Sequence, residues 1–210
     1  MQIIEAILLE PVGCLAEFPA QPFNEIAAQC FGRKNKPSKS GSRSYWHLLN
    51  LMETAGNQSV EALELEAVDQ AGAYEDVIPA LTELKAMGIH LFLTSSLSNA
   101  AITRFVAKNG LQEFFSAIWT RDNAAGIKAA PLRSAIAAAL LNPEHVMYLT
   151  DTAEGLKVAN SLGVISVLMM NDPDEARRLT THEPSGGIVS LHELPDFIRL
   201  VAAENAMIKK

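Results

Sequence analysis

Four apolar segments with strand character each end beside a hydroxyl or carboxyl group that could take part in chemistry. A carboxylate can act as a nucleophile, and carboxylates are also ligands for Mg²⁺. If the strands form one open parallel sheet, their carboxyl ends line the crevice in which such sheets bind ligands. We therefore expect the functional site among four strand ends, which are Glu10, Thr94, Thr120–Asp122 and Thr150–Asp151.

The elements that must position these residues alternate regularly from residue 75 onward. Segments with helical spacing of apolar residues are followed by short, almost wholly apolar segments. Because each parallel crossover needs a connecting helix, this alternation predicts an α/β fold, a doubly wound parallel sheet with helices on both faces. Strands are expected at 3–9, 89–93, 117–120, 146–150, 164–169 and 187–190, and helices at 75–87, 98–109, 131–141, 153–162 and 192–204.

Residues 16–73 interrupt the alternation, because they contain helical patterns and no convincing strand. An all-helical insertion directly after the first strand would lie above the strand ends and cover them. We therefore predict a core formed by residues 1–15 and 74–210, and a small helical cap formed by residues 16–73. The helical patterns of the cap cover 22–31, 44–55 and 58–71.

The turn after the first strand resembles the first motif of the haloacid dehalogenase superfamily, Asp-x-Asp-Gly-Thr-Leu. Gly13 and Leu15 match that motif, and Cys14 stands at the position of Thr. Glu10 stands at the position of the nucleophilic Asp, and Val12 at that of the general acid/base. The resemblance covers nearly the whole chain and implies a Rossmann-like core with a small helical cap.

Two further positions follow the order of the family's motifs. The resemblance implies that Thr94, with Ser95 beside it, holds a phosphoryl oxygen, and that Lys128 neutralises charge on the nucleophile and the phosphoryl group. The residues themselves leave alternatives open. Thr94 and Ser95 are also the residue types that cap a helix after a strand, and Lys128 can be an exposed loop lysine.

The last motif of the family is an acidic pair that holds magnesium. Here Asp151 is kept and Thr150 stands where a Glu or Gly is usual. The resemblance implies a Mg²⁺ site formed by Glu10, the carbonyl of Val12 and Asp151. The alternative is that Asp151 is the N-cap of the following helix.

These changes support two hypotheses about function. Glu10 is one methylene longer than Asp, which displaces the carboxylate from the geometry that Mg²⁺ and in-line attack demand. Val12 cannot protonate a leaving alcohol. The first hypothesis is a catalytically weak or inactive family member that binds a ligand or a protein, with weak or absent Mg²⁺ binding. The alternative is an active, atypical phosphatase-type hydrolase that uses Glu10, Lys128 and Asp151.

The composition limits the partners of this chain of 210 residues. Lys and Arg total 17 against 24 for Asp and Glu, so the acidic surface disfavours nucleic acid, which needs basic partners. No segment approaches the ~18 apolar residues of a membrane span, and no basic region marks a signal peptide. Cys14 and Cys30 form no metal spacing, and the histidines are scattered. We expect a cytoplasmic protein with reduced thiols and a small anionic or phosphorylated ligand, and leave the oligomeric state open.

Two features of the predicted cap also bear on ligand binding. The segment 33–43 holds five of the chain's 17 basic residues, which either recruit an anion or form a solvated loop. The residues after it repeat at helical spacing and are expected to form the core of the cap, with a ligand wall as the alternative. They are Tyr45, Trp46, Leu48, Leu49 and Met52.

Overall fold

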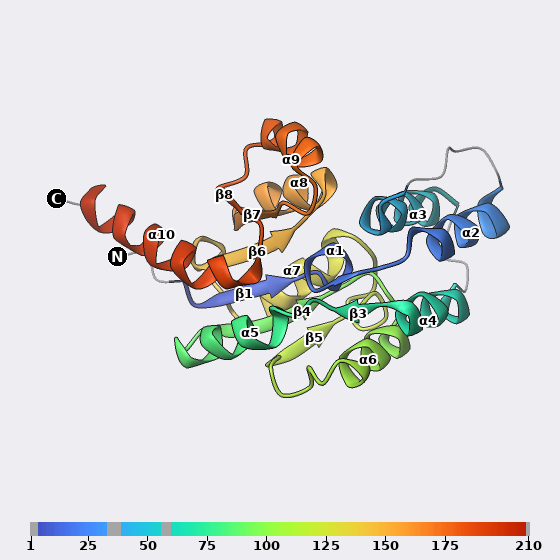
Figure 1. Ribbon diagram of the computed structural model, residues 1–210, viewed down its shortest axis with the longest axis horizontal. Helices are drawn as coiled ribbons and strands as arrows, with labels where there is room; N and C mark the ends of the chain where they lie inside the picture. The colour runs from blue at the N-terminus through green and yellow to red at the C-terminus, as the bar shows by residue number, and fades with distance from the viewer. Residues whose placement is uncertain (1–3, 33–38, 56–59, 209–210) are drawn as a thin grey trace.

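The core of the protein is a six-stranded parallel sheet with the strand order β5-β4-β1-β6-β7-β8 (Figure 1). The computed structural model describes residues 4–32, 39–55 and 60–208. All pairs in this sheet are parallel. The strands are β1 (Ala6–Leu9), β4 (His90–Thr94), β5 (Ala117–Trp119), β6 (Val146–Thr150), β7 (Ile165–Met169) and β8 (Gly186–Ile188).

Strand β1 lies at the point where the winding of the sheet changes direction. The chain first adds β4 and β5 on one side of β1 and then returns to add β6, β7 and β8 on the other. Leu9 at the end of β1 is in register with Leu93 of β4 and Leu149 of β6. Open α/β sheets bind their ligands in the crevice at such a switch point, so the residues that follow these three strands form the candidate site.

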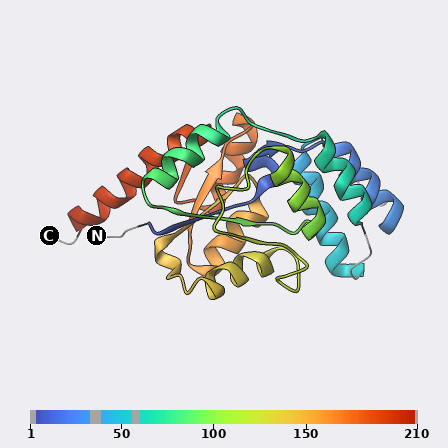
Figure 2. The same ribbon diagram turned by 90° about the horizontal axis from the view of Figure 1, so that it is seen from below.

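Helices cover both faces of the sheet. Ile7 and Leu9 of β1 pack with the buried residues of α5, α6 and α10, whereas Ala6 and Leu8 pack with those of α7 and α8. Figure 2 shows the yellow α7 on one side of the sheet, and the green α5 and red α10 on the other. These helices are α5 (Val77–Ala86), α6 (Asn99–Lys108), α7 (Ala129–Ala138), α8 (Ala153–Leu162) and α10 (Leu194–Ile208). The predicted doubly wound α/β fold is confirmed.

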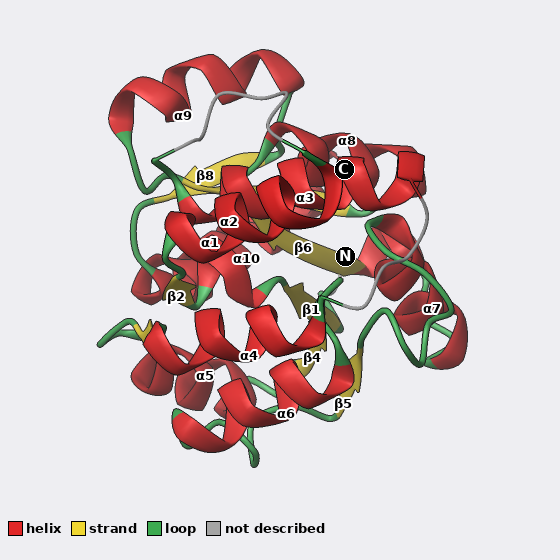
Figure 3. Ribbon diagram, turned by 90° about the vertical axis from the view of Figure 1, so that its right-hand side faces the viewer, coloured by secondary structure: helices red, strands yellow, loops and turns green. Residues whose placement is uncertain are grey.

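Three helices lie between the first strand and the rest of the sheet in sequence, and cover the carboxyl ends of the strands (Figure 3). They are α2 (Ala20–Phe31), α3 (Gly41–Ala55) and α4 (Glu61–Gln70). A small antiparallel pair, β2 (Ala16–Glu17) and β3 (Gly72–Ala73), joins the two ends of this segment. The prediction that the insertion contains no strand was therefore wrong at its two ends. Two residues are too few to show an alternating pattern.

Smaller elements complete the chain. Helix α9 (Pro173–Leu179) was not predicted, because its sequence shows no apolar stripe. Among its described side chains, only Ala176 and Leu179 are buried. No helix in the part of the chain that the structure describes is long and apolar enough to cross a membrane. The remaining elements are α1 (Pro11–Cys14) and the 3₁₀ turns η1 (Pro143–His145), η2 (Thr180–His182) and η3 (Leu191–Glu193).

Candidate active site at the carboxyl edge of the sheet

The turn that follows β1 is held in one conformation from two sides. Gly13 has a φ of +82°, a value that side chains other than glycine rarely adopt. A Cβ atom at this position would overlap the Asp151 carboxyl group. Asn171, which follows β7, donates its side-chain N–H to the Gly13 carbonyl at 2.7 Å. The turn therefore places Gly13 directly against Asp151, the residue that follows β6.

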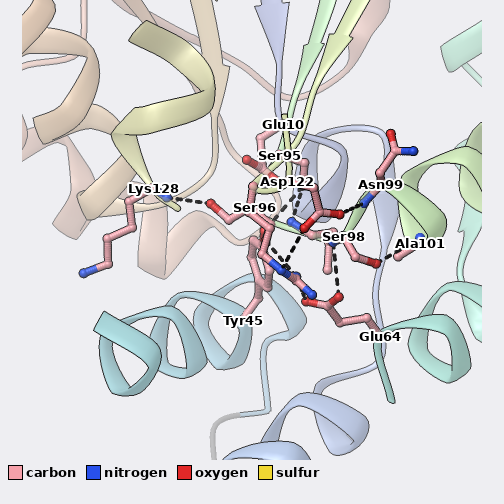
Figure 4. Close-up of polar contacts among 12 residues, drawn as sticks. Glu10, Tyr45, Glu64, Ser95, Ser96, Ser98, Asn99, Ala101, Asp122 and Lys128 are labelled. Carbon is pink, nitrogen blue, oxygen red and sulfur yellow. Dashed lines mark hydrogen bonds and ion pairs between the residues drawn. The ribbon is translucent and has the colours of Figure 1, made fainter. Parts of the chain in front are cut away.

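Glu10 is buried close to Ser95, and Tyr45 of helix α3 reaches the same region (Figure 4). The Glu10 side chain is 5% exposed, and its Oε1 accepts a hydrogen bond of 2.9 Å from Ser95 Oγ. The Tyr45 hydroxyl lies 3.4 Å from the same Ser95 oxygen and is itself completely buried. Burial raises the pKa of Glu10 well above its usual range, and the charge of Asp151 adds to this shift, although the bond from Ser95 opposes it. Burial thus disfavours the charged form of this carboxyl.

The structure assigns the hydroxyl contact to Ser95 and not to its neighbour. Thr94 Oγ1 is buried and has no hydrogen-bond partner in the described part of the chain. Neither residue caps the following helix, because Ser98 Oγ accepts the hydrogen bond from the Ala101 N–H at 3.2 Å. The capping alternative for Thr94 and Ser95 was therefore wrong, because Ser98 is the N-cap of α6.

Lys128 turns its ammonium group toward helix α3. Its Nζ donates to Asn50 Oδ1 at 2.6 Å and forms an ion pair with Glu53 Oε2 at 2.5 Å. Figure 4 shows the Lys128 side chain pointing away from Glu10. The alternative of an exposed loop lysine was wrong, since this side chain is 17% exposed. The resemblance assigns Lys128 to the charge of the nucleophile and the phosphoryl group, whereas here its ammonium is bound by α3.

Asp151 follows β6 and contacts α3 from below. Its Oδ2 accepts hydrogen bonds from Ser42 Oγ at 2.5 Å and from Asn171 Nδ2 at 3.3 Å. Burial raises the pKa of Asp151 to about 7, against the lowering effect of these two bonds. The N-cap alternative was wrong, because Thr152 Oγ1 accepts the bond from the Gly155 N–H.

A cavity of about 950 Å³ opens beside Asp151, between α3 and the ends of β6 and β7. Trp46, which also belongs to the buried core predicted for the cap, contributes an aromatic wall. Arg33, Lys34 and Lys36 of the basic segment lie outside the described residues, whereas Lys39 and Arg43 line the cavity. Its other charged lining residues are Glu17, Glu154, Asp172 and Arg178. Glu10 and Lys128 do not line it.

The residues proposed for magnesium do not fit that ion in this arrangement. Among the described residues, no group of three or more His, Cys, Asp or Glu side chains is placed to hold a metal. Glu10 is occupied by Ser95, and Asp151 by Ser42 and Asn171. Mg²⁺ requires near-octahedral oxygen ligands, and one oxygen of each carboxyl already accepts hydrogen bonds from protein donors.

A buried ion pair joins helix α4 to the loop after β5, and the sequence did not reveal it. The Arg121 guanidinium contacts the Glu64 carboxylate, and these side chains are 9% and 0% exposed. Arg121 also donates to the Ser96 carbonyl at 3.1 Å, and the Ser98 N–H donates to Glu64 at 3.2 Å. The sequence pattern indicates the strand end Thr120–Asp122 but no partner for it. The partner is 57 residues away in sequence, and a lone Glu on a charged helix reads as solvated.

The fold and the site together define a class: a doubly wound α/β protein whose candidate site follows the central strand beneath inserted helices. The chain belongs to the haloacid dehalogenase-like hydrolase family, whose family model matches residues 20–169. That match begins after the turn that contains Glu10 and Val12. The resemblance read from the motifs is confirmed at the level of the family.

Individual relatives agree with this assignment. The chain is 29% identical over 142 residues to phosphoglycolate phosphatase from Cereibacter sphaeroides, covering 67% of this chain. It spans 64% of the length of that curated relative. A haloacid dehalogenase-like family hydrolase from Streptococcus pneumoniae has the same fold, with a TM-score of 0.73, 16% identity, and coverage of 94% of this chain and 99% of that chain. L-2-haloacid dehalogenase from Xanthobacter autotrophicus has a TM-score of 0.64, with 15% identity and the same two coverages.

Proposed function

We propose that this haloacid dehalogenase-like protein binds a small anionic or phosphorylated ligand and has lost efficient phosphoryl transfer. The observation that carries this proposal is the state of Glu10. Its carboxyl group is buried, bonded to Ser95 and shifted toward the neutral acid. A protonated carboxyl is a poor nucleophile, since attack requires the free electron pair of the carboxylate.

Two further positions support the loss of turnover. Val12 offers no proton to a leaving alcohol, and a missing general acid/base typically lowers the rate by ~10²–10⁴. Lys128 is held by Asn50 and Glu53, so its charge is directed at helix α3. Both positions add to the loss of turnover that the state of Glu10 predicts.

The cavity beside Asp151 supports the binding part of the proposal. Because the pKa of Asp151 is about 7, its carboxyl is partly neutral near pH 7 and repels an anion less than an ordinary aspartate. Lys39, Arg43 and Arg178 face the same cavity. The similarity to phosphoglycolate phosphatase favours a phosphorylated or carboxylate ligand of small size.

Hydrolysis of 4-nitrophenyl phosphate with Mg²⁺ tests the proposal. We expect no turnover by the wild type above a matched Asp151→Ala preparation, which reports contaminating phosphatases. We expect turnover by the Glu10→Asp/Val12→Asp double variant, and less by Glu10→Asp alone, because only the double variant has both the shorter carboxylate and the acid. Calorimetric titration with phosphoglycolate should show binding by the wild type.

Wild-type turnover that equals or exceeds that of the double variant would overturn the proposal. Glu10 would then be a competent catalytic residue, and the chain an active, atypical hydrolase. The sequence similarity to a phosphatase favours that second function. The contacts described in the site do not add to it.

A further inference from the structure

The ammonium group of Lys128, a residue of the core, is bound by side chains of the inserted helix α3. Lys128 Nζ is bound by two groups one helical turn apart, Asn50 Oδ1 at 2.6 Å and Glu53 Oε2 at 2.5 Å. The Lys128 backbone is fixed separately, since its N–H donates to Ser96 Oγ at 2.6 Å. A change of partner at the ammonium therefore needs only a rotation of the side chain.

The same helix forms one wall of the cavity. Ser42, Trp46 and Asn50 all line it, and Asn50 is also a ligand of the Lys128 ammonium. Lys128 is thus one residue removed from the cavity, on the far side of Asn50. Its nearest anionic partner, Glu53, is 63% exposed. Ion pairs with an exposed partner are weak, so another anion can displace this one.

Helix α4 is held much more firmly. Its Glu64 forms the buried pair with Arg121, and Lys108 Nζ donates to the Val68 carbonyl at 3.3 Å and the Ala71 carbonyl at 2.8 Å. Loss of the Lys128 contact therefore removes one tie between α3 and the core, while the Ser42–Asp151 bond and the contacts of α4 remain.

We propose that Glu53 is an internal competitor for Lys128, which an anionic ligand must displace before the ammonium can serve the site. The inference rests on the proposed function, because it assumes an anionic ligand. Its consequence is a coupling between two events: an anion that takes Lys128 also releases the contact that ties α3 to the loop before α7. Glu53 therefore sets the anion affinity of the site without touching the ligand.

Calorimetric titration with inorganic phosphate tests this competition. We expect Glu53→Gln to bind phosphate about two- to fivefold more tightly than the wild type, the range that corresponds to a largely exposed ion pair. Glu66→Gln is the matched control, since it removes the same charge from an exposed position of α4. It should leave the affinity unchanged. In the Lys128→Gln background, Glu53→Gln should have no effect.

Three results would each overturn the inference. They are an equal gain in Glu66→Gln, a gain from Glu53→Gln that persists without Lys128, and no phosphate binding by Glu53→Gln. Thermal unfolding of each variant shows whether it is folded, and the exposure of Glu53 makes its loss compatible with folding. These outcomes are separate from the hydrolysis assay, because phosphate affinity is measured without turnover.

Discussion

Ser42, in the first turn of helix α3, donates a hydrogen bond to the Asp151 carboxyl at the end of β6, 109 residues away in sequence. This bond crosses from the inserted helices to the centre of the sheet. It meets a carboxyl that is also contacted by Asn171 and lies against Gly13. The Asp151 carboxyl therefore both fixes the position of α3 and carries a titratable proton, because its Oδ2 accepts the bond from Ser42.

The raised pKa of Asp151 predicts how stability depends on pH. The folded state holds the Asp151 proton up to about pH 7, whereas an unfolded Asp releases it near its usual pKa of about 3.9. Between these values the folded state binds more protons, so the free energy of unfolding falls as pH rises. We expect Asp151→Asn to flatten this fall. Urea unfolding at pH 5 and pH 8 measures it, and an undiminished difference between these pH values in the variant would contradict the prediction.

Removal of one partner of the buried Arg121–Glu64 pair should destabilise the protein strongly. Glu64→Gln keeps the shape of the side chain but leaves the Arg121 charge buried and unpaired. We expect a loss of about 3–5 kcal/mol in the free energy of unfolding. Asp69→Asn removes an exposed partner of Arg104 and should cost at most about 1 kcal/mol. Similar losses in the two variants would show that the buried pair has no special role.

Two effects make Gly13 hard to replace, its positive φ and the lack of space for a Cβ atom, and their costs in stability can be measured separately. Gly163 also has a positive φ, of 70°, but an added Cβ there meets no atom within 4 Å. Gly163→Ala should therefore cost only the about 1–2 kcal/mol of a left-handed backbone. Gly13→Ala should cost clearly more, because the new methyl overlaps the Asp151 carboxyl. Adding Asp151→Ala should recover part of the excess in chemical denaturation, and no recovery would refute the overlap as its cause.

Magnesium should bind weakly or not at all at the predicted position. One oxygen of Glu10 and one of Asp151 accept hydrogen bonds from protein donors, and burial raises the pKa of both carboxyls, which disfavours the charged forms that Mg²⁺ binds. We expect a calorimetric Mg²⁺ titration of the wild type to show no micromolar site. The outcome that sinks this prediction is a micromolar dissociation constant that Asp151→Ala abolishes.

The elements of the core were predictable from sequence because each has its own periodicity. The expected strand 146–150 and helix 153–162 coincide with β6 and α8, and the other core elements differ by a few residues at their ends. Even in α8, whose bounds agree, the cap itself differs, because Thr152 and not Asp151 accepts the capping hydrogen bond. The two-residue strands β2 and β3 carry no pattern to detect.

The candidate site was only half predictable. The sequence indicated which strand ends would meet, and Glu10 and Asp151 do lie at neighbouring strands. It did not indicate that Tyr45 would reach Ser95, or that Lys128 would bind Asn50 and Glu53. These contacts depend on how α3 packs onto the sheet. Nothing local to either partner specifies that packing.

The placement of β1 explains which parts of the first motif persist in this chain. All four residues of β1 are buried, and the strand is hydrogen-bonded on both sides. Leu15 is fully buried, and Gly13 has room for no side chain. The two positions that match the family pattern, Gly13 and Leu15, are thus ones that packing of the fold requires. The two that differ, Glu10 and Val12, stand where the pattern has its acids, so this fold can form without those acids.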